Sequence, residues 1–300
     1  MLRALLFPAM AALLLAGCSA SGHAAADGGR TVVATTTQAA DLARAVGGAR
    51  VSVVGLLAPN ADPHDYEVRP DDVKALAGAM LVVRSGGDLD DWLGDAIEAS
   101  GTHAPTLTLI DHVERRGDDP HWWQDPRNGI RAVAALRDGL VRADPDGRRG
   151  YVRRAAHVTA RLRALDAAAA RCLARIPASR RKLVTTHDAL GYYAARYDLE
   201  VVGTVIPSLS TRAQPSAGDV AALVAMIRRE GVGAVFAESS VRPEVERAIA
   251  REAGARVGRP LWADTLGPAE SDGATYLRSL AANTRAIAEG LGALRCRLPA

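Results

Sequence analysis

The chain has 300 residues, of which 48% are hydrophobic, 24% charged and 4% aromatic, and its mean hydropathy is zero. This composition excludes a wholly disordered chain, and the length is enough for two domains or one large one. The formal net charge is only +3, from 37 basic and 34 acidic residues, and the basic residues form no long run. We therefore expect no nucleic-acid partner.

The first 17 residues have the pattern of an export leader. Arg3 is followed by an apolar stretch over residues 4–16, which is shorter than the ~20 residues of a membrane-spanning helix. Leu-Ala-Gly then precedes Cys18, which resembles a bacterial lipobox and implies cleavage before Cys18 and lipidation of that residue. A plain secretory leader is the alternative. Residues 18–30 have the Gly/Ala/Ser-rich composition of a flexible tether. We expect an exported chain that is lipid-anchored to the outer face of the cell membrane or faces the periplasm.

Two further cysteines, Cys172 and Cys296, form an even pair. An exported compartment permits a disulfide between them, and two buried free thiols are the alternative. A disulfide would fasten the C-terminal tail to the helix that carries Cys172.

Short β-rich segments alternate with helical segments over residues 31–143, the predicted N-terminal lobe. The predicted strands are 31–37, 51–57, 80–84 and 106–110. The predicted helices are 38–46, 70–79, 88–99 and 129–141. A repeat of this kind predicts a parallel sheet with helices on its faces.

The middle of the chain, over residues 144–177, predicts one long helix. After the turn at 144–147, apolar residues recur at spacings of three and four as far as Ile176, and Pro177 ends the pattern. A single rigid helix between two lobes predicts little hinge closure on ligand binding, with local ordering of loops instead.

The alternation returns over residues 178–300, the predicted C-terminal lobe. The predicted strands are 182–186, 200–206, 232–237 and 260–263, and the helices are 189–197, 216–229, 243–253 and 273–290. The predicted fold class is therefore α/β, with two lobes that each hold a four-stranded, mainly parallel sheet flanked by helices and are joined by one long helix. We expect a monomer.

Four residues with metal-binding side chains follow predicted strands two, four, five and eight: His64, His121, His187 and Asp264. Ligands bind at the carboxyl ends of strands in open α/β sheets, and each lobe supplies two of the four, so they could converge between the lobes. Three imidazoles and one carboxylate suit tetrahedral Zn²⁺, whereas Mn²⁺ prefers oxygen ligands. Local hydrogen bonding in a loop is the alternative for each residue taken alone.

Five short motifs, in order, resemble those of the ZnuA/TroA-like solute-binding proteins, the zinc- and manganese-binding receptors of ABC importers. The motifs are 62–67 with 70–72, 120–126, 186–193, 236–240 and 263–266, and the likeness covers residues 31–292. The resemblance implies a receptor rather than an enzyme, with the same four residues as ligands. It also implies an ABC-importer membrane permease as partner.

The resemblance also bears on the metal. In manganese-binding members the third ligand is typically Glu, so His187 indicates Zn²⁺, with Mn²⁺ as the alternative. Many zinc-binding members have a long His- and acid-rich loop before the second ligand. Only residues 111–119 fill that space here, so we do not expect the zinc-gathering role proposed for that loop.

A metal-bound imidazole usually donates its other N–H to a carboxylate or carbonyl. The candidate partners near the ligands are Asp62, Asp65, Asp125, Asp188 and Glu238. For Asp62 and Asp125, each of which precedes a proline, a turn or helix cap is the alternative.

Two other functions remain open at this point. A zinc hydrolase would need an open coordination position and a general base; the chain has no His-Glu-x-x-His, Gly-x-Ser-x-Gly or P-loop motif, but Asp264 as the base would leave a three-histidine catalytic site. A second role as an adhesin or metal chaperone at the cell surface is also open. For a metal receptor, the ordinary imidazole pKa predicts that affinity falls as the pH drops through about 6.5.

Overall fold

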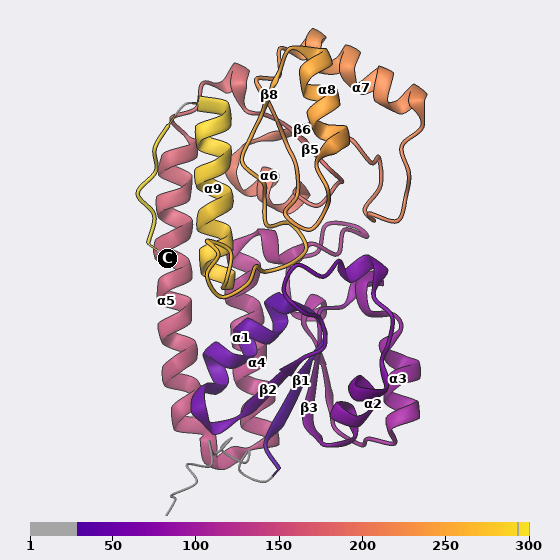
Figure 1. Cartoon of the computed structure of the whole chain (residues 1–300). Coiled ribbons are helices and arrows are strands. Elements are labelled where there is room, and N and C mark those ends of the chain that lie inside the picture. Colours follow the sequence, from indigo (N-terminus) through magenta and orange to yellow (C-terminus); the bar gives the residue numbers. More distant parts are fainter. Residues whose placement is uncertain (1–28, 293, 300) are drawn as a thin grey trace, which may run out of the picture.

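A computed structural model describes residues 29–292 and 294–299 of the chain (Figure 1). The predicted leader, Cys18 and nearly all of the predicted tether lie outside these residues. Within the described ranges, no helix combines the length and the apolar character needed to cross a membrane.

The N-terminal sheet has four parallel strands in the order β2-β1-β3-β4. The strands are β1 (Thr31–Ala34), β2 (Ser52–Gly55), β3 (Ala79–Arg84) and β4 (Thr106–Thr108). The helices are α1 (Thr37–Gly47), α2 (Pro70–Ala77), α3 (Leu93–Ser100) and α4 (Pro126–Ala143). Val33 and Val82 of the central strands pack with α2 and α3, while Val32 and Val83 pack with α1 and α4. Both faces of the sheet are therefore covered, as its apolar strands require.

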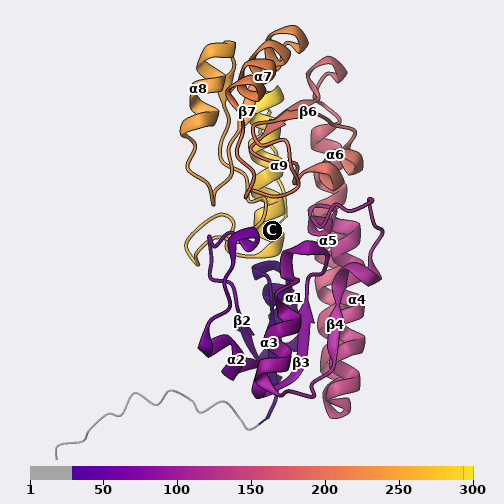
Figure 2. The same ribbon diagram turned by 90° about the vertical axis from the view of Figure 1, so that its right-hand side faces the viewer.

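The lobes are joined by α5 (Arg148–Leu173). It is shorter at both ends than the predicted 144–177, because Pro145–Gly147 form a 3₁₀ turn and the helix ends four residues before Pro177. At 1.5 Å per residue it is about 39 Å long. Val158 and Leu162 pack in the N-terminal core, whereas Ala169 and Leu173 pack in the C-terminal core. One helix thus packs against both lobes, although the C-terminal lobe with α7 and α8 extends beyond its end (Figure 2).

The C-terminal sheet repeats the arrangement, in the order β6-β5-β7-β8. The strands are β5 (Lys182–Thr185), β6 (Glu200–Thr204), β7 (Ala234–Phe236) and β8 (Arg256–Val257). The helices are α6 (Gly191–Tyr197), α7 (Ala217–Glu230), α8 (Glu244–Ala253) and α9 (Tyr276–Gly292). The two parallel sheets confirm the predicted fold class.

The predicted eighth strand at 260–263 is wrong. The last strand is β8, and Leu261 forms only an isolated parallel bridge with Glu238. Pro260 has no N–H to donate to the sheet, so the ladder is interrupted after β8 and resumes for the single residue Leu261, whose N–H donates to Ala237 O at 2.9 Å.

Several contacts fix the two lobes against each other. Helix α9 lies beside α5 and, like it, contributes to both cores, through Leu280 in the N-terminal one and Ile287 in the C-terminal one (Figure 1). The Thr37 hydroxyl in the first lobe accepts the N–H of Leu266 at 2.9 Å. Movement of one lobe relative to the other would have to disturb both helices.

Cys172 of α5 and Cys296 of the C-terminal tail are joined by a disulfide, with a sequence separation of 124 residues. We expect the double substitution C172A/C296A to destabilise the chain by about 4–5 kcal/mol, since closing a loop of this length restricts the unfolded state. Denaturant unfolding of oxidised wild type, reduced wild type and the variant measures this. Reduced wild type serves as the control and should match the variant, and equal stability of all three would contradict the prediction.

Candidate metal centre

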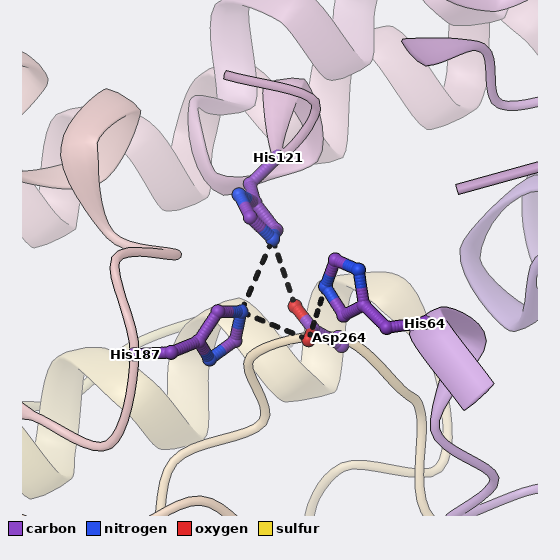
Figure 3. A group of neighbouring side chains, drawn as sticks. All are labelled: His64, His121, His187 and Asp264. Atoms are coloured by element: carbon purple, nitrogen blue, oxygen red, sulfur yellow. Dashed lines mark hydrogen bonds and ion pairs between the residues drawn. The ribbon is translucent and has the colours of Figure 1, made fainter. Parts of the chain in front are cut away.

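Three imidazole rings and one carboxylate meet between the two lobes (Figure 3). The structure brings together all four residues that the sequence placed after strands: one ligand atom from each of His64, His121, His187 and Asp264 lies within 4.8 Å of the others. All four are buried; His64 is 7% exposed and the others at most 1%.

The N-terminal lobe positions two of the rings by short turns. His64 lies in a 3₁₀ turn after β2, where the Asp62 carboxylate accepts its backbone N–H at 2.9 Å. His121 directly precedes a second 3₁₀ turn that leads into α4. Trp122 and Trp123 in that turn are almost fully buried, so packing fixes the segment behind His121.

The C-terminal lobe supplies the other two residues. His187 follows β5, and its carbonyl accepts the Thr185 hydroxyl at 2.8 Å. The backbone before Asp264 is held from the opposite lobe: Ala263 O accepts Trp123 Nε1 at 2.8 Å and Gln124 Nε2 at 2.7 Å. The residues just after His121 therefore also set the position of Asp264.

Four of the distances between candidate ligand atoms are close to those expected for a tetrahedral shell. His187 Nε2 lies 3.1 Å from Asp264 Oδ2, and the Nε2 atoms of His64 and His121 each lie 3.3 Å from one oxygen of that carboxylate. The Nε2 atoms of His121 and His187 are 3.3 Å apart. Ligands of a tetrahedral zinc ion, at 2.0–2.2 Å from the metal, would be about 3.3–3.6 Å apart.

Several polar atoms of the four clustered residues have no hydrogen-bond partner among the described residues. They are His64 Nε2 and both carboxylate oxygens of Asp264. Buried polar atoms normally have a partner, because leaving one without costs free energy. A cation at the centre of the four side chains would satisfy all three atoms.

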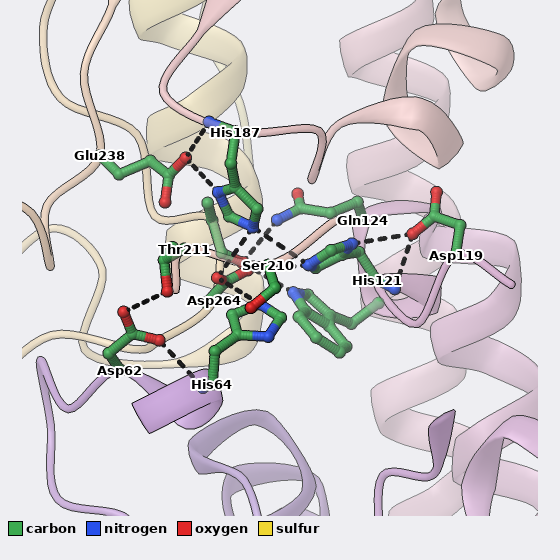
Figure 4. A network of polar contacts seen from close by, with 12 residues as sticks. Asp62, His64, Asp119, His121, Gln124, His187, Ser210, Thr211, Glu238 and Asp264 are labelled. Atoms are coloured by element: carbon green, nitrogen blue, oxygen red, sulfur yellow. Dashed lines mark hydrogen bonds and ion pairs between the residues drawn. The ribbon is translucent and has the colours of Figure 1, made fainter. Parts of the chain in front are cut away.

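Carboxylates contact the Nδ1 atoms of two of the rings, on the opposite side of each ring from Nε2 (Figure 4). His187 Nδ1 lies 2.6 Å from Glu238 Oε1, as predicted for Glu238. His121 Nδ1 lies 2.8 Å from Asp119 Oδ1, a residue that the sequence analysis missed. Each contact favours the proton on Nδ1 and leaves Nε2 free to bind a metal. The repeated Asp-Pro-His tripeptide, at 62–64 and 119–121, was the signal that could have identified Asp119.

The other candidate partners do not contact an imidazole ring of the site. Asp62 binds the backbone N–H of His64 and the Thr211 hydroxyl, the latter at 2.6 Å. Asp125 caps α4 and pairs with Arg127 at 2.6 Å, which agrees with the helix-cap alternative. Asp65 and Asp188 have no hydrogen bond to the four residues within the described part of the chain.

The charges of the site depend on one another. Burial raises the pKa of Asp264, but the neighbouring His187 and His121 outweigh it and hold that pKa well below its usual value. Burial lowers the pKa of His187, but the Asp264 and Glu238 carboxylates outweigh it and raise the pKa to about 11. Burial raises the pKa of Glu238. Without a bound cation, His187 therefore keeps a proton that neutralises part of this negative charge.

Comparison with known proteins identifies the family. Residues 32–290 match the ZnuA family model, described as zinc-uptake complex component A, periplasmic. Zinc-binding protein TroA of Treponema pallidum is 30% identical over 284 residues, which cover 90% of this chain and 92% of TroA. Manganese-binding lipoprotein MntA of Bacillus subtilis is 31% identical over 296 residues, covering 94% and 96% of the two chains.

Solved structures share the fold. The structure of periplasmic zinc-binding TroA from Treponema pallidum has a TM-score of 0.82 at 28% identity and covers 88% of this chain and 99% of that one. A cadmium-bound periplasmic metal-binding protein from Candidatus Liberibacter asiaticus has a TM-score of 0.79 at 20% identity, covering 87% and 99%. The chain therefore belongs to the ZnuA family of metal-binding ABC-transporter substrate-binding proteins, whose members are receptors and not enzymes.

Proposed function

We propose that this chain is an exported lipoprotein receptor that binds one Zn²⁺ between its lobes and delivers it to the membrane permease of an ABC importer. The observation that carries the proposal is the buried meeting of three Nε2 atoms with the Asp264 carboxylate, one ligand atom of each residue lying within 4.8 Å of the others. The export and lipid anchor rest on the predicted leader and Cys18, and relatives such as MntA of Bacillus subtilis are named lipoproteins.

The four side chains have distinct roles in this proposal. His64, His121 and His187 bind the ion through Nε2, and Asp264 supplies the negative charge. Four protein ligands complete a tetrahedral zinc shell and leave no position for a reactive water, so the chemistry is coordination and release. Asp119 and Glu238 act through the rings of His121 and His187 by fixing their orientation.

Mn²⁺ is the second candidate cargo. The three nitrogen ligands favour Zn²⁺, since Mn²⁺ prefers oxygen. Both oxygens of Asp264 nevertheless face imidazole nitrogens, which would allow the carboxylate to bind through both. A relative of similar identity, MntA of Bacillus subtilis, is named manganese-binding. Nothing among the described residues adds support for an adhesin or chaperone role.

Loss of one ligand should weaken zinc binding strongly. We expect H187A to reduce the Zn²⁺ affinity by more than about 100-fold, because even a lost partner of a ligand typically costs 10–100-fold. Competition with a chromophoric chelator gives the affinity, and mass spectrometry gives the metal content. H157A, at an exposed position of α5, is the matched control and should bind like wild type. Wild-type affinity in H187A would contradict the ligand assignment.

Zinc binding should release a proton. Because the metal-free site raises the pKa of His187 to about 11 and only neutral imidazole binds metal, the apparent affinity should rise about tenfold per pH unit through neutrality. As the pH decreases, the loss of zinc affinity would therefore begin far above the pH of 6.5 expected from the sequence. Calorimetry in buffers of different ionisation enthalpy counts the protons. E238Q removes one of the carboxylates that raise this pKa and should shift the dependence to lower pH, whereas zinc binding without proton release at pH 7.5 would contradict the proposal.

The same proton gives the metal-free protein a pH-dependent stability. The folded pKa of His187 lies above its unfolded value, so its stabilising contribution is complete below about 6.5 and is lost as the pH rises toward 11. Thermal unfolding across this pH range should show that metal-free E238Q loses less stability with rising pH than metal-free wild type.

The third ligand should decide between the two metals. Replacing the His187 nitrogen by a carboxylate oxygen in H187E favours Mn²⁺, and we expect the ratio of zinc to manganese affinity to fall at least about tenfold. Parallel titrations with both ions measure the ratio, with H187Q as a neutral control that adds no carboxylate. An unchanged ratio of the two affinities in H187E would show that residues other than His187 determine the metal selectivity.

A further inference from the structure

The junction of α4 and α5 exposes four arginines that lie close together in the sequence, within residues 142–153. We call Arg142, Arg148, Arg149 and Arg153, together with Val152, the basic corner; all five are exposed. Asp146, Arg148, Arg149, Val152 and Arg153 line one shallow hollow of about 580 Å³. Val152 is 45% exposed and is among the few large apolar side chains of the described residues with that much contact with water.

Few acidic groups compensate this charge. None of the four arginines forms an ion pair with a carboxylate in the part of the chain that the structure describes. Asp138 nearby is paired with Arg137 at 2.8 Å, which leaves Asp146 as the acidic group in the hollow. The single acid on α5, Asp166, is paired with Arg196 at 2.7 Å.

The described chain begins at this same corner. Arg30 Nε lies 3.8 Å from an oxygen of Asp144, the residue at which α4 ends, and Arg50 donates to the same carboxylate at 2.7 Å. Fully extended, the segment from Cys18 to Arg30 spans at most about 40 Å. A lipid on Cys18 would therefore keep the basic corner close to a bilayer. The metal centre lies beyond the opposite, carboxyl ends of the strands (Figure 1).

We propose that the basic corner binds the anionic headgroups of the membrane that carries the lipid anchor. This proposal rests on the lipid anchoring in the proposed function. Guanidinium groups pair with lipid phosphates and are attracted by the negative surface potential of anionic lipids. Val152 among them supplies the apolar contact typical of helices that lie at a membrane interface.

Vesicle binding by the unlipidated chain tests the proposal. The protein is the chain from residue 18 onward with Cys18→Ser, which contains every described residue, so any binding reports the surface and not the lipid. We expect it to sediment with phosphatidylglycerol-containing vesicles and not with pure phosphatidylcholine, and to be released as rising salt screens the charges. R148Q/R149Q/R153Q should bind at least about tenfold more weakly.

A matched variant separates this surface from net charge. R242Q/R247Q/R251Q removes the same charge from exposed positions on and just before α8, at the opposite end of the molecule, and should bind vesicles like the parent chain (Figure 1). Equal losses in both variants, or no preference of the parent for anionic vesicles, would overturn the proposal. Zinc titration of the same samples reports the proposed function separately, and it should be unchanged in both variants.

A second measurement needs no substitution. Phenylglyoxal modifies exposed arginines, and mass spectrometry locates the products. Anionic vesicles should protect Arg148, Arg149 and Arg153 while leaving Arg247 and Arg251 reactive. Equal modification of both groups with and without vesicles would overturn the proposal even if the triple variant failed to fold.

Discussion

The carboxylate of Asp264 is the constraint on which the rest of the structure depends. It is 1% exposed and lies between three imidazole nitrogens, and a buried carboxylate is tolerated only with a compensating positive charge. A proton on His187 supplies that charge in the metal-free site, and the bound metal ion would supply it in the proposed function. Binding would then be an exchange of one cation for another at a negative site that the fold maintains.

The fold maintains this site by linking its two halves directly. Trp123 and Gln124 follow His121 in the N-terminal lobe and donate to the carbonyl that precedes Asp264 in the other lobe. Helices α5 and α9 contribute to both cores, so large rotation of the lobes would break packing in each. The least restrained of the candidate ligands is His64, the most exposed of the four, on a short turn whose Asp62 accepts the Thr211 hydroxyl. Release by local movement rather than hinge opening stays a prediction.

The sequence predicted the strand ends and therefore the meeting of the four candidate residues, because the carboxyl ends of parallel strands share one edge. It placed Asp264 in the site although the strand before it was wrong, since one bridge at Leu261 suffices to bring the chain back to that edge. It missed Asp119, whose place depends on the other lobe: the Tyr192 hydroxyl of α6 accepts the Arg116 N–H at 2.9 Å and donates to Asp119 O at 3.2 Å. The Asp-Pro-His repeat is a local sign of the contact between Asp119 and His121, but no local pattern shows this support from the other lobe.

The small net charge of +3 conceals a separation of charge within the folded N-terminal half. Beside His64, Asp88 and Asp91 line a hollow that leads to the most exposed ligand, with Arg212 as its one basic side chain. The basic corner lies at the other end of the N-terminal sheet, near the start of β1. Charges separated by more than the Debye length, about 8–10 Å in physiological salt, scarcely interact. One lobe can therefore present arginines to an anionic surface at one end without repelling a divalent cation at the other.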